Sequence, residues 1–309
     1  MNLKGKDFLT LADYDKESIN YLLDLASRLK QDNKIGKKHH ILKNKTLAMY
    51  FEKPSLRTRM SFEVGIQQLG GNALILKKEE VNLGTRETIA DTARVVSRYV
   101  DGIMIRTFAH SDVEEFAKWA DIPVINGLTD NLHPCQILAD LLTIKEKLGP
   151  LEDLKLAYLG DGNNMANSLL LGCSIMGMDV SIGCPDGYEP DPVYVKKAEE
   201  FADKSGSIID ITDNPLEAIE LANVIYTDVW ASMGQENEAE SRKDIFKPYQ
   251  INSELLGNAI EDAIVLHCLP AHRGEEITEE VLEKFAPIIF EQAENRLHAQ
   301  KSILASVIQ

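Results

Sequence analysis

The segment Lys53–Arg59 brings three cationic side chains and two hydroxyl groups together in a chain whose formal net charge is −16. It follows an apolar run at Thr46–Phe51 and precedes a helical pattern, so a strand, a polar turn and a helix are expected in that order. A helix start has unpaired backbone N–H groups and a dipole that attracts negative charge, which makes it a binding site for an anion. The hydroxyls of Ser55 and Thr58 add donors, and Arg57 can bind two phosphate oxygens at once.

This pattern alone leaves two interpretations of the segment open. Charged residues are common at the starts of solvated helices, so an ordinary helix start would look similar. So dense a cationic segment in an acidic chain favours an anion site. The sequence GxxxxGK[ST] does not occur in the chain, which argues against a nucleoside triphosphate as the ligand.

A second group of polar residues lies later in the first half. Arg106 follows the apolar run Gly102–Ile105, and His133–Gln136 opens a long helical pattern. An arginine and a histidine at the ends of such elements can converge on one small polar group. A single histidine before a helix is more often a cap or a surface residue, and that alternative stays open.

In the second half, the turn Gly160–Met165 follows the apolar run Lys155–Leu159 and resembles a dinucleotide-binding turn. That fingerprint requires Gly or Ala where Met165 stands, so a bound dinucleotide is not expected. Asp228 follows the run Val224–Thr227, a position suited to ligand binding at the carboxyl end of a parallel strand. Its carboxylate could bind an α-ammonium group.

Cys268 follows the apolar run Ile264–His267 within the sequence His-Cys-Leu-Pro. A thiol in this position could accept or steer a proton, provided that its surroundings favour the thiolate. Buried packing is the ordinary alternative for a single cysteine.

Short apolar runs alternate with helical patterns along the chain, which predicts an α/β fold with parallel sheets. The expected strands lie at residues 46–51, 73–76, 102–105, 123–125, 155–159, 179–183, 207–211, 224–227 and 264–267. The helix after His133 meets a stop signal at Gly149-Pro150. We therefore expect one domain at 1–148 and a second at 149–288, followed by a C-terminal helix within 289–309.

Other segments carry simpler expectations. Apolar residues at 89, 93, 96 and 100 predict one helix face, with Thr88 and Asp91 at its start. Pro215 suits the first turn of another helix, capped by Asp213 or Asn214. The final helix is expected at 291–307. Residues 235–250 are polar and charged, and they predict a mobile surface loop or lid.

The overall composition excludes several classes of protein. The 309 residues are 44% hydrophobic, enough for two ordinary domains, and the negative charge argues against nucleic acid or an anionic membrane as a partner. The four cysteines form no CxxC pair and no zinc-ligand spacing, so no metal is expected. The start of the chain lacks an apolar targeting segment, which predicts the cytoplasm.

The sequence Ser55-Leu56-Arg57-Thr58-Arg59 resembles the S-x-R-T-R signature of the aspartate and ornithine carbamoyltransferases. Further motifs follow in that family's order: Arg106, H-P-x-Q at 133–136, G-D-G-N-N at 160–164, D-x-x-x-S-M-G at 228–234, H-C-L-P at 267–270 and E-N-R at 294–296. Each motif is weak to moderate, but seven in order make coincidence a poor explanation. The resemblance implies two three-layer αβα sandwich domains with parallel sheets, joined by interdomain helices, with 289–309 packing back on the first domain.

The resemblance also implies the residues of a carbamoyl-phosphate site. They are Ser55, Leu56, Arg57, Thr58, Asn82, Arg106, His133, Pro134, Cys135, Gln136, Cys268, Leu269 and Arg296. Arg106 and His133 would donate to the carbonyl oxygen, and Gln136 would hold the amide nitrogen. Asn82 would come from a neighbouring subunit, at a position where members of the family often carry Gln or His.

Ornithine binding is implied for Asn164, Asp228, Ser232 and Met233, and catalytic roles for Arg57, Arg106, His133, Asp228 and Cys268. The D-x-x-x-S-M-G and H-C-L-P motifs are similar to those of the ornithine-specific members. The implied reaction transfers the carbamoyl group of carbamoyl phosphate to the δ-amine of L-ornithine, giving L-citrulline and phosphate in arginine metabolism. No metal or organic cofactor is implied.

The implied assembly is a homo-oligomer, a trimer or a multiple of trimers, with active sites near the subunit interfaces. Two alternatives stay open. The acceptor could be another amine, namely acetylornithine, succinylornithine or putrescine, although the two second-half motifs speak against this. The chain could also be a non-catalytic regulatory homologue, but such a protein would be expected to lose Arg57, His133 or Asp228, and all three are present.

Overall fold

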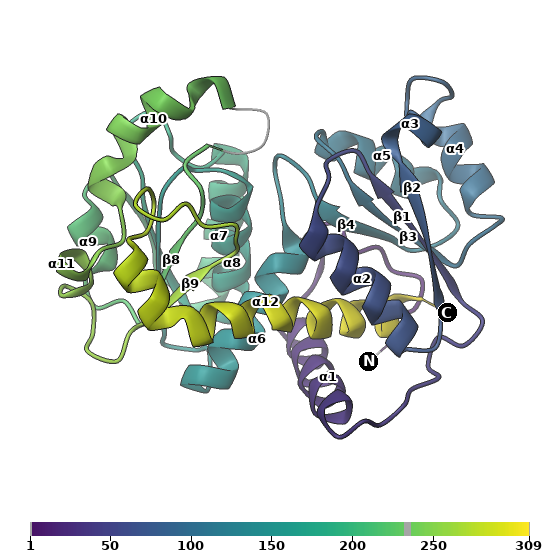
Figure 1. The fold of residues 1–309 in the computed structure, drawn as a ribbon, viewed down its shortest axis with the longest axis horizontal. Coiled ribbons are helices and arrows are strands. Elements are labelled where there is room, and N and C mark those ends of the chain that lie inside the picture. The colour runs from purple at the N-terminus through teal and green to yellow at the C-terminus, as the bar shows by residue number, and fades with distance from the viewer. Residues whose placement is uncertain (1, 232–235, 309) are drawn as a thin grey trace. The chain divides into compact units, whose positions relative to one another are not determined.

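The computed structural model describes residues 2–231 and 236–308, and Figure 1 shows their fold. The chain divides into two compact units. Unit 1 comprises Met1–Leu142 and Asn295–Gln309, and unit 2 comprises Thr143–Glu294. The divisions fall inside helix α6 (Pro134–Leu148) and helix α12 (Glu279–Val307), so each of these helices contributes residues to both units.

Unit 1 contains a parallel sheet with the strand order β2-β1-β3-β4. Its strands are β1 (Thr46–Phe51), β2 (Asn72–Lys77), β3 (Gly102–Arg106) and β4 (Val124–Leu128). Phe51 and Arg106 are register partners at the carboxyl ends of β1 and β3. This pairing brings the cationic segment after β1 to the same edge of the sheet as Arg106.

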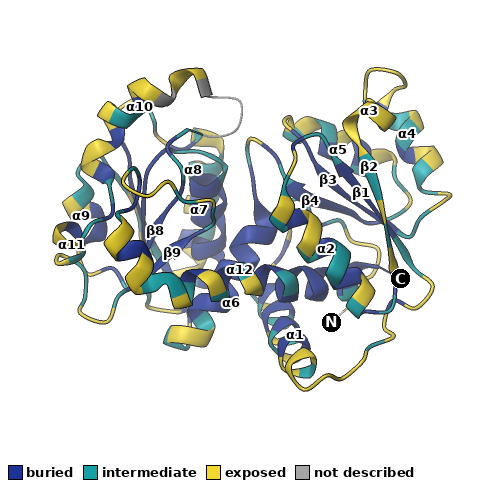
Figure 2. Ribbon diagram, in the orientation of Figure 1, coloured by how far each residue is buried: buried dark blue, intermediate teal, exposed yellow. Residues whose placement is uncertain are grey.

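The helices of unit 1 pack on a sheet whose strands β1, β3 and β4 are largely buried, while the edge strand β2 is partly exposed. These helices are η1 (Leu11–Asp13), α1 (Lys16–Lys34), α2 (Leu56–Gln68), α3 (Lys78–Val81), α4 (Ile89–Val96) and α5 (His110–Trp119), with parts of α6 and α12. Ala48 and Tyr50 form a core with residues of α4 and α5. Their neighbours Leu47 and Met49 point to the other face and are also fully buried, as the dark strands in Figure 2 show.

Unit 2 contains a second parallel sheet, with the strand order β7-β6-β5-β8-β9. The strands are β5 (Lys155–Leu159), β6 (Asp179–Gly183), β7 (Ile209–Thr212), β8 (Val224–Thr227) and β9 (Ile264–His267). Leu159 of β5 is paired with Thr227 of β8, and Thr227 is paired with His267 of the edge strand β9. Consequently, the turn after β5, Asp228 and Cys268 all begin at one edge of this sheet.

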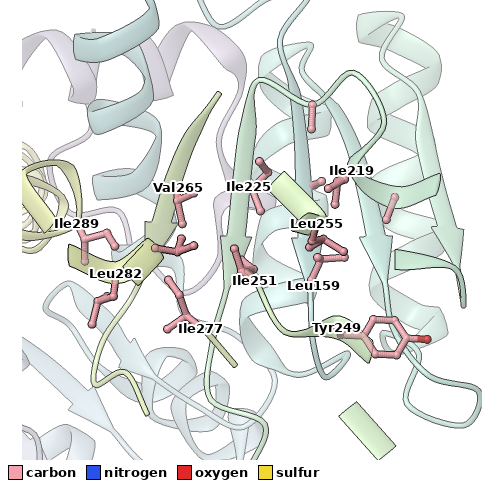
Figure 3. Packing of buried hydrophobic residues seen from close by; sticks show 14 residues of the cluster. Leu159, Ile219, Ile225, Tyr249, Ile251, Leu255, Val265, Ile277, Leu282 and Ile289 are labelled. Carbon is pink, nitrogen blue, oxygen red and sulfur yellow. The ribbon is translucent and has the colours of Figure 1, made fainter. Parts of the chain in front are cut away.

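The helices of unit 2 are α7 (Asn164–Met176), α8 (Pro192–Ser205), α9 (Pro215–Ile219), η2 (Glu236–Glu238), α10 (Ala239–Phe246), η3 (Lys247–Tyr249) and α11 (Ser253–Leu256), with parts of α6 and α12. On one face of the sheet, Leu159, Ile225 and Val265 pack against α9, α11 and the first turns of α12 (Figure 3). Residues 165–176 of α7 are buried without exception. Thus α7 is a core helix whose N-terminus adjoins the predicted ligand turn.

Most of the predicted elements are confirmed, several to the residue, including β1, β5 and β6. Asn214 caps α9, as one of the two predicted caps: its Oδ1 accepts from the backbone N–H of Leu216 at 3.0 Å. The helical face predicted through Val100 is shorter than expected, because α4 ends at Val96 and Val100 lies beyond the turn at 97–99.

The predicted start of the final helix was wrong. Helix α12 begins at Glu279 rather than at 291, and it continues through Pro287. An interior proline normally ends a helix, and the sequence gives no sign that this one is tolerated. As a result, Arg296 lies well inside the helix and not at its start.

The description of residues 235–250 as a surface loop was also wrong for the part that the structure describes. From Glu236 to Tyr249 the chain is helical, and Phe246 and Tyr249 are buried in unit 2. The residues around these two aromatic side chains are mostly polar, so the sequence pattern does not predict their burial.

Among the described helices, none combines the length and the apolar character that would let it cross a membrane.

Candidate active site

In unit 1, the N-terminus of α2 has the features of an anion site. Ser55 is the N-cap, and its hydroxyl accepts a hydrogen bond from the backbone N–H of Thr58 at 3.3 Å. The first turn of α2 contains no acidic residue. Leu56 is 72% exposed, so its side chain leaves the backbone of this turn accessible. The positive end of the helix dipole is therefore uncompensated by any carboxylate of its own turn.

Thr58 connects three elements at this helix start. Its hydroxyl is fully buried and accepts hydrogen bonds from Arg296 Nη2 at 2.8 Å and from Arg106 Nη1 at 3.4 Å. Ser55 Oγ donates to Thr58 Oγ1 at 3.1 Å. Two guanidinium groups, from the end of β3 and from α12, are thus brought to one hydroxyl.

His133 lies in the same cluster and is 5% exposed. Burial holds the pKa of His133 well below its usual value, and Arg296, Arg106 and Arg57 lower this pKa further. Three guanidinium groups repel another cation, and a buried imidazolium would also lose its hydration. His133 is therefore a neutral imidazole, which can offer one N–H donor without adding charge.

The first turn of α6 supplies two more buried groups. Gln136 donates from Nε2 to Asp140 Oδ1 at 2.8 Å, while its buried Oε1 has no hydrogen-bond partner among the described residues. Cys135 donates from Sγ to the carbonyl of Asn126 at 3.3 Å. Burial raises the pKa of Cys135 to about 12, so this thiol is not a nucleophile near neutral pH. Pro134 is the first residue of the helix.

The cations of the Lys53–Arg59 segment have different surroundings. The buried Lys53 forms an ion pair with Asp130, and its Nζ lies 4.2 Å from the centre of the Phe108 ring. The exposed Arg59 pairs with Glu63 at 3.4 Å. Arg57 is half-buried in the first turn of α2, which makes it a candidate for binding an anion at this helix start.

Asn82 is exposed and lies at the end of α3, where its backbone is left-handed, with φ 48° and ψ 55°. Asparagine adopts this conformation more readily than most residues that carry a side chain. The local backbone therefore gives a physical reason for asparagine at this position.

In unit 2, Asp228 and Cys268 lie in direct contact. Cys268 Sγ donates to Asp228 Oδ1 at 2.9 Å, and the backbone N–H of Val229 donates to the same oxygen at 2.8 Å. The other oxygen, Oδ2, accepts from Asn163 Nδ2 at 3.4 Å. Asp228 is 8% exposed, so this carboxylate is held in a largely dry position by three donors.

Asn163 is a site residue that the sequence reasoning missed. It is the N-cap of α7, and its Oδ1 accepts from the backbone N–H groups of Met165 and Ala166. The predicted ligand residue Asn164 is the first residue of the helix and is half-buried. Neighbouring asparagines in one turn could not be told apart in the sequence, although a cap residue directly before an apolar helix was a usable signal.

Arg242 is a second residue that was missed. This buried side chain donates to Asp161 Oδ2 at 2.9 Å, to the carbonyl of Trp230 at 3.0 Å and to Glu238 Oε2 at 3.1 Å. Burial raises the pKa of Asp161, and Arg242 opposes this shift by stabilising the carboxylate. Arg242 thus joins α10 to the turn after β5 and to the loop after β8. The predicted ligands Ser232 and Met233 lie outside the described residues.

A metal ion could be considered at Asp228, His267 and Cys268, whose ligand atoms lie within 4.8 Å of one another. However, His267 Nδ1 accepts from the backbone N–H of Leu269 at 2.8 Å, and Nε2 bonds Glu276 at 3.0 Å. Because both ring nitrogens are already engaged, the imidazole does not suit a metal ligand.

Both parts of the chain match domains of one family of known proteins. The carbamoyl-phosphate-binding domain of the aspartate/ornithine carbamoyltransferases matches residues 6–146, and their Asp/Orn-binding domain matches residues 152–307. An ornithine carbamoyltransferase from Anoxybacillus flavithermus is 59% identical over 308 residues, covering 100% of this chain and 98% of that protein. An anabolic ornithine carbamoyltransferase from Pyrococcus furiosus is 53% identical, with the same coverage.

A solved ornithine carbamoyltransferase from Pyrococcus furiosus has the same fold. It superimposes with a TM-score of 0.96 at 52% identity, covering 100% of this chain and 98% of the solved one. The matches thus span both units and both parallel sheets. The chain belongs to the aspartate/ornithine carbamoyltransferase family, among its ornithine carbamoyltransferases.

Proposed function

We propose that this chain transfers the carbamoyl group of carbamoyl phosphate to the δ-amine of L-ornithine, giving L-citrulline and phosphate for arginine biosynthesis. The observation that carries the proposal is the contact of Thr58 with Arg106 and Arg296 at the start of α2. A helix N-terminus with converging guanidinium groups suits a small phosphorylated ligand.

The phosphate of the donor is assigned to the start of α2. Ser55, Leu56, Arg57 and Thr58 would bind it through backbone N–H groups, hydroxyls and one guanidinium. Asn82 would add a contact from a neighbouring copy of the chain. The exposure of Asn82 and the absence of an acidic residue from the first turn of α2 support this assignment.

The carbamoyl end is assigned to the cluster behind that helix start. Arg106 and the neutral His133 would donate to the carbonyl oxygen, and Arg296 would reach the same ligand. Gln136 suits the amide group, because its buried Oε1 is an acceptor without a partner among the described residues. Pro134, Cys135 and Leu269 would contribute backbone groups, since the Cys135 side chain already bonds Asn126.

L-Ornithine is assigned to unit 2. Asn164, Asp228, Ser232 and Met233 would bind it, with Asp228 close to an amine. The contact of Asp228 with Cys268 supports a role for this pair in handling the proton of the δ-ammonium group. Asn163 also donates to Asp228, and we add it as a residue that orients the carboxylate.

In the proposed reaction, the neutral δ-amine attacks the carbonyl carbon and forms a C–N bond. The bond between that carbon and the phosphate oxygen breaks, and phosphate leaves with the electron pair. Asp228 and Cys268 accept or steer the amine proton, while Arg106 and His133 stabilise the oxyanion and Arg57 stabilises the phosphate. Donors aimed in this way typically contribute about 10²–10³-fold each in rate. The residues supply all of this chemistry without a cofactor.

We further propose residues 1–148 as the carbamoyl-phosphate domain, 149–288 as the ornithine domain and 289–309, which include the second part of α12, as a segment returning to the first. The proposed assembly is a homotrimer or a multiple of trimers, because Asn82 would serve a neighbouring copy. The proposed compartment is the cytoplasm. The four cysteines are free thiols, which suits a reducing environment.

An initial-rate citrulline assay over both substrate concentrations tests this function. Wild-type protein should form citrulline with saturation in carbamoyl phosphate and in L-ornithine. Arg57→Gly should stay folded and lose nearly all turnover, because the phosphate loses its guanidinium. Arg59→Gly is the matched control, since Arg59 is exposed and pairs with Glu63. Near-normal turnover in Arg57→Gly would contradict the phosphate assignment.

A further inference from the structure

His267 makes three hydrogen bonds at the end of β9, and its side chain is fully buried. Its Nδ1 accepts from the backbone N–H of Leu269 at 2.8 Å, and its Nε2 lies 3.0 Å from Glu276 Oε1. Its own backbone N–H donates to Gln292 Oε1 at 3.0 Å. The ring and the backbone of this residue are thus fixed from three directions.

These contacts define the tautomer of His267. A backbone N–H can only donate, so Nδ1 must present its lone pair to Leu269. The proton of the ring is therefore on Nε2, which donates it to Glu276. Glu276 Oε1 also accepts from the backbone N–H of His272 at 2.6 Å. His267 is consequently a neutral imidazole that ties β9 to the far end of the loop 268–276.

The bond from Leu269 to the His267 ring closes a turn of two residues around Cys268. Asparagine and aspartate close such turns with a side-chain oxygen that accepts from the N–H two residues later. Leu269 has φ 59°, a left-handed conformation that leucine rarely adopts. The ring nitrogen of His267 stabilises this conformation by accepting the Leu269 N–H.

We propose that His267, locked as the neutral tautomer by Leu269 and Glu276, is a positioning residue that closes this turn and directs Cys268 at Asp228 as a thiol. The proposal rests on the proposed carbamoyl transfer for its kinetic consequences. Its structural consequence, the state of the Cys268 thiol, is independent of the reaction.

The neutral ring has a direct chemical consequence. Reactive thiolates in enzymes are commonly paired with an imidazolium or another cation. His267 supplies no positive charge, and the Asp228 carboxylate 2.9 Å from Sγ disfavours a second negative charge. Cys268 therefore serves as an S–H donor to Asp228, which leaves Asp228 as the acceptor for the amine proton.

Two substitutions test the hydrogen bonds of the two ring nitrogens separately. His267→Asn keeps an acceptor that can bond the Leu269 N–H and loses the Glu276 partner, whereas His267→Gln keeps a donor for Glu276 and loses the acceptor. We expect kcat/KM for ornithine to fall by roughly 10- to 100-fold in His267→Gln, because a buried N–H is left unpaired, and by less than about 10-fold in His267→Asn. His272→Asn is the matched control on the same loop, since the side chain of His272 is exposed.

Alkylation of Cys268 by iodoacetamide, followed by mass spectrometry, gives a readout that does not need turnover. Cys135, Cys173 and Cys184 are buried, so Cys268 is the accessible thiol. In wild-type protein the rate should rise only at alkaline pH, and it should rise further in His267→Gln, in which the turn is released. His267→Asn and His272→Asn should match wild type.

Several results would overturn this inference. Fast alkylation of wild-type Cys268 at pH 6 would reveal a thiolate. If His267→Asn and His267→Gln are both folded and lose kcat/KM for ornithine equally, the acceptor for the Leu269 N–H has no special role. Should His267→Gln fail to fold, the alkylation profiles of wild type and His267→Asn still decide the question. Failure of the proposed function looks different, because wild-type protein would then form no citrulline while its alkylation profile stayed as expected.

Discussion

Cys268 Sγ donates a hydrogen bond to Asp228 Oδ1 across 2.9 Å, although forty residues separate them in the sequence. The register of the sheet explains this contact. Thr227 and His267 are direct partners on β8 and β9, so the residues that follow them leave the sheet side by side. The parallel pairing thereby places a thiol against a carboxylate at the edge where ligands of α/β sheets bind.

This contact predicts different effects of two substitutions at Cys268. Cys268→Ser keeps a donor for the Asp228 carboxylate and should lower kcat by less than about 10-fold. Cys268→Ala removes the donor and should lower kcat by more than about 10-fold, because the buried carboxylate loses one of its hydrogen bonds. Initial rates at saturating substrate measure both effects, and an unchanged kcat in Cys268→Ala would reduce Cys268 to a packing role.

The buried hydroxyl of Thr58 predicts a selective effect on the carbamoyl donor. Thr58→Val keeps the shape of the side chain and removes the acceptor for Arg106 and Arg296. We expect KM for carbamoyl phosphate to rise by roughly 10- to 100-fold, because bonds to charged donors are lost. The rise in unfolding temperature that inorganic phosphate gives wild-type protein should also shrink.

Thr92→Val is the control for this experiment, since the Thr92 hydroxyl donates to a carbonyl of its own helix. It should change neither the KM nor the response to phosphate. An unchanged KM in Thr58→Val would mean that Arg106 and Arg296 keep their positions without the hydroxyl.

Arg242 predicts a link between stability and ornithine binding. Arg242→Met leaves the buried Asp161 carboxylate unpaired and should lower the free energy of unfolding by about 3 kcal/mol. It also releases the Trp230 carbonyl, so KM for ornithine should rise while KM for carbamoyl phosphate stays constant. Chemical denaturation and initial rates measure the two effects.

Two further variants sharpen this prediction. Lys243→Met removes a neighbouring half-buried cation that pairs with Glu240 and Glu275, and it should leave the ornithine KM unchanged. Adding Asp161→Asn to Arg242→Met should restore part of the stability, because the unpaired charge is gone, but not the affinity for ornithine. If Arg242→Met loses stability alone, its role is confined to packing.

Lys301 predicts a pH dependence of stability. It is buried on α12 and donates to Gln68 Oε1 at 2.9 Å and to the carbonyl of Leu29 at 3.3 Å. Burial lowers the pKa of Lys301 to about 8, below its ordinary 10.5. Between these values the unfolded chain binds the proton and the folded chain does not, so this group makes the protein more stable as the pH rises through that window.

The comparison with Lys301→Met isolates this contribution. Across the window from about pH 8 to 10.5, the free energy of unfolding of the variant should rise less steeply with pH than that of wild type. The difference in slope should correspond to at most about one proton bound by the unfolded chain. Urea denaturation at a series of pH values measures the slopes. Equal slopes would show that Lys301 titrates at its ordinary value in the folded protein.

The strands could be predicted from the sequence because their residues are apolar on both faces. Runs such as 46–51 and 155–159 need no distant contact to be recognised, and the parallel pairing follows from the helices between them. The order of the motifs, from Ser55 to Arg296, likewise indicates the family from the sequence alone.

What the sequence could not predict depends on side-chain direction and on contacts between distant segments. Asn163, the N-cap of α7, donates to Asp228, which lies sixty-five residues later in the sequence. Arg242 stood in a charged run and looked solvated, yet its partner Asp161 lies eighty-one residues earlier. The hydrogen bond from the Leu269 backbone N–H to the His267 ring depends on the left-handed backbone of Leu269, which no local sequence pattern predicts.

The most direct test of the account is to identify the products formed from labelled carbamoyl phosphate and a panel of amines. The panel contains L-ornithine, acetylornithine, succinylornithine and putrescine, each at the same concentration with wild-type protein. We expect labelled citrulline with L-ornithine and little product with the other three, because the proposed acceptor site requires a free α-amino acid group and a free δ-amine. Equal or greater labelling of another amine, or no labelled citrulline, would contradict it.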